Sequence, residues 1–282
     1  MAIDYDDLMA REVKDMPYSF GDRETMLYAL GVGMGEDPMD EAELDYVFEK
    51  NLKTVPTMAA LFGQGSSLLQ GAGINHTLVV HGEQRVALKK PIPAECDMLV
   101  DSRVAGAFDK GEKGAIIVME TTAREKSSGD VISIATSGIF ARGDGGFGGP
   151  REGAPQPHSI PDRAPDEVCE LKTKPDQALI YRLSGDRNPL HADPEFADAA
   201  GFSRPILHGL CTYGVACRAV LKTLCDYDHT KIAGFDARFS APVFPGETVV
   251  TEMWVDGKTV SYRCRLKERD AVVINNGRCE LR

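Results

Sequence analysis

Residues 208–224 read HGLCTYGVACRAVLKTL, and this stretch predicts a helix that begins near His208. Four strand-like runs with turn residues between them follow it. They are AGFDARFSAP (233–242), ETVVTEMWV (247–255), TVSYRCRLKE (259–268) and AVVINNGRCEL (271–281). The second half of the chain is therefore expected to contain one central helix followed by an antiparallel meander. A shorter helix should precede it, since Asp193 suits an N-cap and Pro194 the first helical position.

The first half of the chain repeats this order. VPTMAALFGQGSSLLQG (55–71) looks helical, and four strand-like runs follow it. These runs are HTLVVHGEQRVALKK (76–90), CDMLVDSRVAGAF (96–108), GAIIVMETTAREK (114–126) and DVISIATSGIFAR (130–142). A shift of 151 residues places Phe62 and Gly63 on Tyr213 and Gly214, and a shift of 152 places PAE (93–95) on PGE (245–247). The repeat indicates an internal duplication.

One sheet wrapped around one buried helix, present twice, is the double hotdog architecture, of class α+β. We expect two antiparallel sheets, each wrapped around a central helix and joined edge to edge, because that arrangement hides their open edges. Residues 143–167 contain six Gly and five Pro, a density that no helix or central strand tolerates. The expected organisation is an N-terminal half at 1–142, a linker at 143–167 and a C-terminal half at 168–282.

The composition limits the classes of function. The chain has 282 residues, of which 43% are hydrophobic and 27% charged, as in ordinary globular proteins. A net charge of -11 argues against a nucleic-acid binder, and no apolar run approaches the roughly 18 residues that cross a bilayer. The seven cysteines are scattered and include no CxxC, so neither a disulfide framework nor a zinc ribbon is indicated. A reducing compartment fits best.

The densest cluster of chemically reactive residues is YRLSGDRNPLHADP, at 181–194. Pro189 fixes its own φ and keeps Asn188 out of the helical region, so the chain between Asp186 and His191 should be stiff. A carboxylate and an imidazole can then face one point, as general acid–base catalysis requires. A plain polar turn is the alternative, because Ser, Gly, Asp, Asn and Pro are all turn formers.

A metal site is a further alternative for this cluster. Its candidate ligands are Asp186, His191, Asp193 and His208. No helical HxxxH or other definite ligand spacing supports it. We therefore predict a site without a metal or a redox cofactor.

PILHGL (205–210) adds a second element at the start of the central helix. The first N–H groups of a helix are unsatisfied, and glycine lets a ligand approach the backbone closely. The N–H of Gly209 could thus polarise a carbonyl oxygen, which together with an acid–base pair suggests chemistry on an ester or thioester. The alternative is a capping glycine that touches no ligand.

These motifs resemble a known family. YRLSGDRNPLH (181–191) and GFSRPILHGL (201–210) are similar to the signature of the MaoC-like (R)-specific 2-enoyl-CoA hydratases, also called hydratase 2. Further blocks resemble the two-hotdog members found in peroxisomal multifunctional β-oxidation proteins and their bacterial relatives. These blocks are LYALGVG (27–33), HGEQ (81–84), FDKG (108–111) and GGFGG (145–149). The resemblance covers nearly the whole chain.

The resemblance implies roles for individual residues. Asp186 and His191 would be the catalytic pair, Asn188 would support the site, and the N–H of Gly209 would bind the thioester oxygen. The substrate-contacting positions would be His81, Gly82, Lys110, Arg187, Pro189, Leu190 and Phe239. A lysine in a turn can meet a CoA phosphate, and a phenylalanine on a strand can line an acyl or pantetheine channel. The simpler interpretations are a solvated hairpin residue and a core residue.

The resemblance also implies the reaction, which is reversible hydration of a trans-2-enoyl-CoA to a (3R)-3-hydroxyacyl-CoA in fatty-acid β-oxidation or related acyl-CoA metabolism. A hotdog acyl-CoA thioesterase and a non-catalytic acyl-CoA binding module are the alternatives. A hydratase–dehydrogenase is not expected, because no GxGxxG follows a strand. We expect a cytoplasmic location, since the chain ends CELR and not with an SKL-type signal. We also expect a homodimer. A peroxisomal location within a larger multifunctional protein is the alternative.

The two halves differ at the positions that would carry the chemistry. A shift of 151 residues places Gly35, Asp40 and Met58 where the second half has its acid, its base and its oxyanion donor. The first half therefore lacks the catalytic pair. We expect it to offer its volume to the acyl chain instead.

Overall fold

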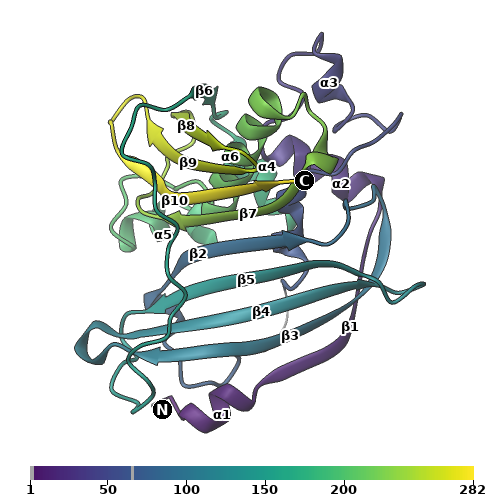
Figure 1. Cartoon of the computed structure of the whole chain (residues 1–282). Helices are drawn as coiled ribbons and strands as arrows, with labels where there is room; N and C mark the ends of the chain where they lie inside the picture. Colours follow the sequence, from purple (N-terminus) through teal and green to yellow (C-terminus); the bar gives the residue numbers. More distant parts are fainter. Residues whose placement is uncertain (1–2, 65–66) are drawn as a thin grey trace.

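The computed structural model describes residues 3–64 and 67–282. Its strands are β1 (Glu12–Phe20), β2 (Val79–Leu88), β3 (Cys96–Asp109), β4 (Ala115–Glu125), β5 (Val131–Ala141), β6 (Glu167–Lys172), β7 (Ile232–Phe239), β8 (Thr248–Asp256), β9 (Thr259–Leu266) and β10 (Val272–Leu281). Within the described residues these strands form one continuous sheet in the order β1-β3-β4-β5-β2-β7-β10-β9-β8-β6 (Figure 1).

The helices are short apart from the last. The α-helices are α1 (Tyr5–Ala10), α2 (Asp22–Gly31), α3 (Glu41–Leu44), α4 (Gln177–Tyr181), α5 (Pro194–Ala199) and α6 (Gly209–Leu224). The 3-10 helices are η1 (Pro56–Leu61), η2 (His76–Leu78), η3 (Gly111–Lys113), η4 (Arg182–Ser184), η5 (Pro189–His191) and η6 (His229–Lys231). Among the described residues, no helix is both long and apolar enough to span a membrane.

The two halves are joined through β2 and β7. Residues 83–87 of β2 pair antiparallel with residues 234–238 of β7, so an edge strand of one half is covered by an edge strand of the other. This pairing satisfies backbone groups that would otherwise be open to another chain. The double hotdog fold and its edge-to-edge junction are confirmed.

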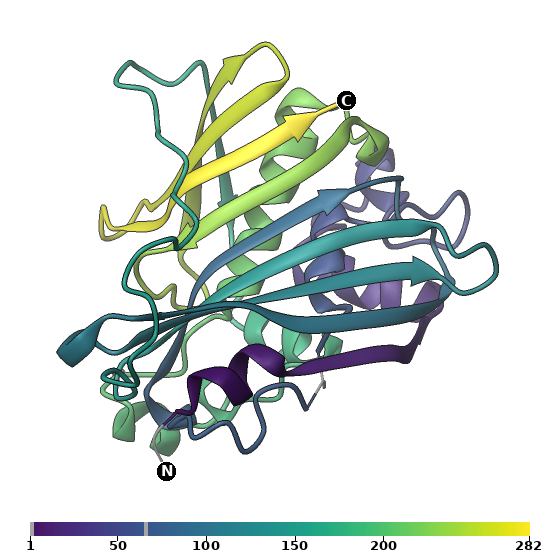
Figure 2. The same ribbon diagram turned by 60° about the horizontal axis from the view of Figure 1, so that its bottom comes forward.

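α6 forms the centre of the second half, as predicted from residues 208–224. The side chains from Cys211 to Leu221 are buried, and β7, β10, β9 and β8 curve around the helix (Figures 1 and 2). Small residues on α6 let the first half approach its backbone. A Cβ atom at Gly214 would lie only 2.3 Å from Cγ1 of Val32, so glycine is required at that contact.

The long helix expected at 55–71 is wrong. The chain forms only the six-residue η1 there, and turns follow it in the described part of the segment. Residues 65 and 66 of the predicted helix lie outside the described residues. Just after η1 the chain packs closely against the sheet, since a Cβ atom at Gly63 would lie 2.7 Å from Oγ1 of Thr121 on β4. Glycine fits that contact and is a poor helix former.

The first-half counterparts of the catalytic residues have structural roles. The N–H of Gly35 donates to the carboxylate of Glu43, Asp40 caps α3, and the side chain of Met58 is buried in the core. None of these three positions offers an acid or base facing a shared point. That the first half takes no part in the chemistry stays a prediction.

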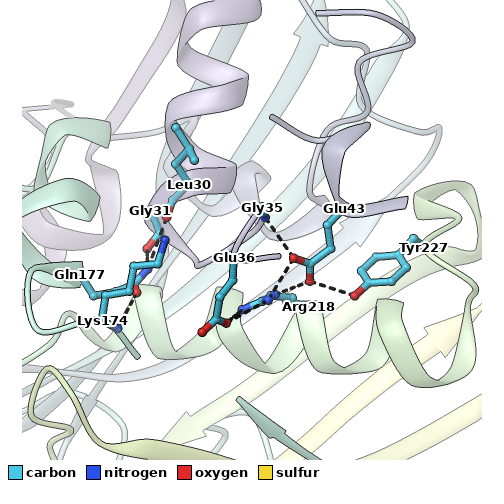
Figure 3. A network of polar contacts seen from close by, with 9 residues as sticks. All are labelled: Leu30, Gly31, Gly35, Glu36, Glu43, Lys174, Gln177, Arg218 and Tyr227. Carbon is cyan, nitrogen blue, oxygen red and sulfur yellow. Dashed lines mark hydrogen bonds and ion pairs between the residues drawn. The ribbon is translucent and has the colours of Figure 1, made fainter. Parts of the chain in front are cut away.

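A buried ion pair ties the first half to α6 (Figure 3). Nε of Arg218 on α6 lies 2.7 Å from the carboxylate of Glu43, which also accepts from the hydroxyl of Tyr227 at 2.8 Å. Burial acts to raise the pKa of Glu43, but the Arg218 guanidinium and the Tyr227 hydroxyl outweigh it and leave the pKa lowered. Nearby, the amide of Gln177 donates to the carbonyl of Gly31 at 2.6 Å, which holds α4 against the end of α2.

The segment between β5 and β6, residues 142–166, crosses the outer face of the sheet, the face turned away from α6 (Figure 1). Asp109 anchors its start, because its carboxylate accepts from the N–H groups of Gly146, Gly148 and Gly111, each at 2.8 Å. These three bonds lower the pKa of Asp109. Further along, Arg85 donates to the carbonyl of Gln156. The linker is therefore fixed to the sheet near its start and again at Gln156.

Candidate active site

Residues 185–191 join η4 to the end of η5, and we call this segment the catalytic loop after the pair that the sequence predicts in it. Its shape follows from local hydrogen bonds of the kind that Asp and Asn make in turns. The N–H of Asn188 donates to the Asp186 carboxylate at 3.1 Å, and the N–H of Leu190 donates to the side-chain oxygen of Asn188 at 3.0 Å. Asn188 thereby caps η5, which carries His191. The role in catalysis that the resemblance implies for Asn188 stays a prediction.

His191 is buried with one ring nitrogen bound to the backbone. Its Nδ1 lies 2.8 Å from the carbonyl oxygen of Ile206. A carbonyl oxygen only accepts, so Nδ1 carries the proton of the neutral ring and Nε2 is left as a free base. Burial lowers the pKa of His191, although the hydrogen bond to Ile206 and the charge of Asp186 act against the shift. The ring is therefore neutral near pH 7 and able to accept a proton.

His208 lies against this pair, and sequence reasoning placed it only among possible metal ligands. Its ring stacks on that of His191, with the centroids 3.6 Å apart and the planes at 27°. Its Nε2 lies 3.1 Å from the backbone oxygen of Asp186. Burial lowers the pKa of His208 to about 4, and the neighbouring His191 adds to the shift.

The cluster formed by Asp186, His191 and His208 offers three potential ligand atoms within 4.8 Å of one another. The stacking argues against a shared metal ion, however. The lone pairs of imidazole nitrogens lie in the ring planes, so two nearly parallel stacked rings cannot both aim a nitrogen at one ion about 2.1 Å away. The arrangement suits proton transfer better than metal binding.

Gly209 begins α6 beside the catalytic loop. As the first helical residue it has no intrahelical acceptor for its N–H, and no other backbone acceptor is bound to it among the described residues. A Cβ atom at this position would lie 3.4 Å from the ring of Phe239, so the phenyl ring flanks the amide. The helix N-terminus thus presents an exposed donor directly after His208, the residue that stacks on His191.

His81 on β2 comes from the first half and packs against Phe239. Its ring meets Phe239 edge to face at a centroid distance of 5.1 Å, and its Nε2 lies 3.0 Å from the carbonyl oxygen of Glu83. Burial lowers the pKa of His81, although the negative charge of Asp186 opposes the shift. The structure therefore places His81 against Phe239, which in turn flanks the first residue of α6.

The remaining predicted substrate positions are spread more widely. Arg187 and Pro189 are exposed on the catalytic loop and Leu190 is half-buried there. Gly82 occupies a β-bulge next to His81. Lys110 lies apart from the loop, in the turn between β3 and β4, where its ammonium donates to the carbonyl of Arg151 in the linker. The structure does not bring Lys110 to the acid–base pair.

A cavity of about 230 Å³ lies on the outer face of the sheet. Its floor includes Gly82 on β2, Gly138 and Phe140 on β5, and Ile116 and Val118 on β4. Ala154 and Pro155 of the linker form its roof. The cavity is mainly apolar and extends from the bulge beside His81 towards the strand that begins next to the Lys110 turn.

Comparison with known proteins places the chain in a family. Residues 157–276 match the MaoC like domain, and residues 18–143 match the MFE-2 hydratase 2 N-terminal domain. The chain is 41% identical over 289 residues to "Enoyl-CoA hydratase 2, peroxisomal" of Arabidopsis thaliana, covering 95% of this chain and 92% of that protein. This chain belongs to the MaoC-like hydratase 2 family.

Other hydratase 2 relatives and a solved structure agree over the full length. "Enoyl-CoA hydratase ChsH3" of Mycobacterium tuberculosis is 41% identical, and the match covers 98% of both chains. The crystal structure of a MaoC-like dehydratase from Phytophthora capsici superposes with a TM-score of 0.88 at 31% identity, covering 99% of this chain and 98% of that one. The match extends through both halves and the linker.

Sequence reasoning missed two features of this hydratase 2 site. One is the stack of His208 on His191. The only hint was that histidine, which is not a favoured N-cap residue, directly precedes the helix. The other is Gln64 from the first half, whose Oε1 would lie 2.6 Å from a Cβ atom at Gly185. Gly185 has a φ of 134°, so this backbone conformation and the close contact both require glycine.

Proposed function

We propose that this protein catalyses the reversible hydration of trans-2-enoyl-CoA to (3R)-3-hydroxyacyl-CoA. The observation that carries the proposal is the cluster in which the Asp186 carboxylate and a neutral, buried His191 offer atoms within 4.8 Å of each other. A water molecule making two hydrogen bonds of about 2.8 Å can bridge such a gap. The names of the close relatives support the same reaction.

In the proposed mechanism the pair acts on that water. The water oxygen attacks C3 of the enoyl thioester while the pair accepts a proton from it. The pair then delivers a proton to C2, so that the enzyme is unchanged at the end. Negative charge that develops on the thioester oxygen is stabilised by the N–H of Gly209, an oxyanion donor of the kind that contributes strongly to such reactions.

No metal or redox cofactor is part of this proposal. The stacked rings of His191 and His208 do not converge on one ion, and hydration involves no net oxidation. Treatment with a chelator such as EDTA should leave the rate unchanged. Loss of activity that an added divalent cation restored would overturn this part of the proposal.

The outer-face cavity is the proposed path for the pantetheine arm of CoA. Strand spacing is about 4.8 Å, so the floor from Gly82 on β2 to Ile116 on β4 spans roughly 10 Å. One end lies where the β2–β7 pairing stops at Glu83 and Arg238, next to His81. The other end lies near the Lys110 turn. Lys110 would meet a CoA phosphate there, although its ammonium contacts the linker in the structure.

The first half is proposed to receive the acyl chain. In the described residues, the position over the first-half strands that corresponds to α6 holds only the short helix η1. A helix therefore covers less of the sheet surface in the first half than in the second half. Ala60 on η1 is only half-buried and packs against the core. A small residue there leaves room for an acyl tail.

The deciding experiment follows loss of enoyl-thioester absorbance with crotonyl-CoA and longer substrates, with chiral analysis of the product. We expect (3R)-3-hydroxyacyl-CoA. Release of free CoA without a hydroxyacyl product would favour a thioesterase, and binding without turnover would favour an acyl-CoA binding module. The homodimer and the cytoplasmic location, with the peroxisome as the alternative, stay predictions that sedimentation and cell imaging can test.

A further inference from the structure

His208 occupies a helix N-cap without capping the helix. Ser, Thr, Asp and Asn are preferred at this position because their side chains accept from the first helical N–H groups. The side chain of His208 makes no such bond, yet it is 1% exposed. Its Nδ1 has no hydrogen-bond partner among the described residues. The ring is directed towards the catalytic loop, which a capping role does not explain.

The two stacked histidines brace two segments against each other. Nε2–H of His208 donates to the backbone of Asp186, which begins the catalytic turn. In the opposite direction, Nδ1–H of His191 donates to the backbone of Ile206, just before α6. Each ring is therefore bound to the segment that carries the other ring. Together with the stacking contact, this arrangement fixes the catalytic loop relative to the first residue of α6.

His208 is poorly suited to proton transfer itself. The groups that face it are His191 and Asp186 of the catalytic loop, Arg182 of η4 and the ring of Tyr181 at the end of α4. Its Nε2 proton is engaged by a carbonyl, and its low pKa keeps the ring neutral at pH 7. Because His208 is neutral, it does not repel the positive charge that develops on His191 during turnover.

We propose that His208 is a positioning residue that holds the Asp186–His191 loop at the correct distance from the Gly209 N–H. This inference rests on the proposed function, because it assigns His208 to that same site. Displacing a catalytic group by about 1 Å can cost about a hundredfold in rate. Loss of His208 should therefore reduce kcat while leaving KM nearly unchanged, since substrate contacts lie on other residues.

Three substitutions separate the two contacts of the ring. His208→Gln keeps a donor at the same reach as Nε2 but loses the stack, and His208→Phe keeps a stacking ring but loses the donor. His208→Ala loses both. We expect kcat to fall by about ten- to a hundredfold in His208→Ala, the range of a misplaced catalytic group, with partial recovery in the other two variants. A KM increase that accounted for the whole loss, or wild-type kcat in all three, would overturn the proposal.

His229→Phe is the matched control. His229 is half-buried, has a buried Nδ1 without a partner among the described residues, and contacts the ring of Tyr46 away from the catalytic loop. It should lose melting temperature without losing kcat in the folded protein. Asp186→Asn, measured in the same assay, distinguishes failure of the positioning role from failure of the proposed function. If it is inactive while the His208 variants are fully active, only the positioning role fails, whereas full activity in Asp186→Asn refutes the proposed site itself.

Discussion

The backbone N–H of Asn188 donates to the carboxylate of Asp186 at 3.1 Å. An asparagine side chain at position 186 offers the same acceptor, so Asp186→Asn should keep the turn and remove only the charge. We expect kcat to fall by about a hundredfold to ten-thousandfold, the usual contribution of a positioned acid or base. Steady-state kinetics with crotonyl-CoA measures this, and circular dichroism checks the fold. Near-wild-type turnover would show that Asp186 is not part of the acid–base pair.

His191→Gln should lose kcat to a similar degree, because it removes the free Nε2. The double variant with Asp186→Asn should lose far less than the product of the two single losses, since both groups act on one water molecule. A full multiplicative loss in the double variant would mean that the two residues act independently.

Stability should fall as the pH drops from about 6.5 towards 4. The pKa of His208 is about 4 in the folded chain, against 6.5 for an unperturbed histidine. Between these values the unfolded chain binds a proton that the folded chain does not. The contribution of neutral His208 to the free energy of unfolding is therefore fully present above pH 6.5 and is lost as the pH falls towards 4. Urea unfolding of wild type and His208→Phe across this range tests the sign. The stability difference between the two proteins should change in favour of the variant as the pH falls.

Glu43→Gln should destabilise the protein by up to about 3–5 kcal/mol, because it removes the buried partner of Arg218 and leaves only the longer, 3.4 Å ion pair with the half-exposed Glu36. Glu12→Gln removes the carboxylate of an exposed pair with Lys14 and should change stability by less than about 1 kcal/mol. Chemical denaturation of both variants gives the comparison. Equal changes in the free energy of unfolding would show that the buried Glu43 pair stabilises the protein no more than the exposed Glu12 pair does.

Lys110→Ala should raise KM for enoyl-CoA by about tenfold, the equivalent of one charge-assisted contact, with kcat unchanged. Lys113→Ala in the same turn is the control and should have little effect, since that side chain is exposed. An N-acetylcysteamine enoyl thioester lacks the CoA phosphates and should not distinguish the two variants from wild type. Equal KM values for both variants with enoyl-CoA would remove Lys110 from the binding site.

Ala60→Leu should depress kcat/KM for long or branched enoyl-CoA and spare crotonyl-CoA, because a larger side chain on η1 would occupy space proposed for the acyl tail. If Ala60 is ordinary packing, melting temperature falls and all substrates are affected alike. The ratio of decenoyl-CoA to crotonyl-CoA activity, measured on the same preparation, separates these outcomes.

Most of the features that could be predicted follow from local patterns in the sequence. The catalytic loop followed from Pro189 and Asn188, whose effects act within a few residues, and α6 followed from a long run of apolar and small residues. The prediction of a long first-half helix was wrong. Gly63, which follows η1, packs against Thr121 on β4, and this contact between segments far apart in the sequence is not visible in the local pattern. The stack of His208 on His191 is equally non-local. It depends on how α6 meets the catalytic loop, which no spacing of residues encodes.

The contact between Glu43 and Arg218 also constrains how the chain is made. The two residues are 175 positions apart, and each depends on the other to compensate a buried charge. During synthesis the ribosome releases the first half well before Arg218 appears, so Glu43 must stay hydrated until most of the second half has emerged. Folding of the first half should therefore remain incomplete on the ribosome, with residues 33–46 closing over α6 late. Limited proteolysis of stalled nascent chains, ending before and after residue 218, would reveal this order.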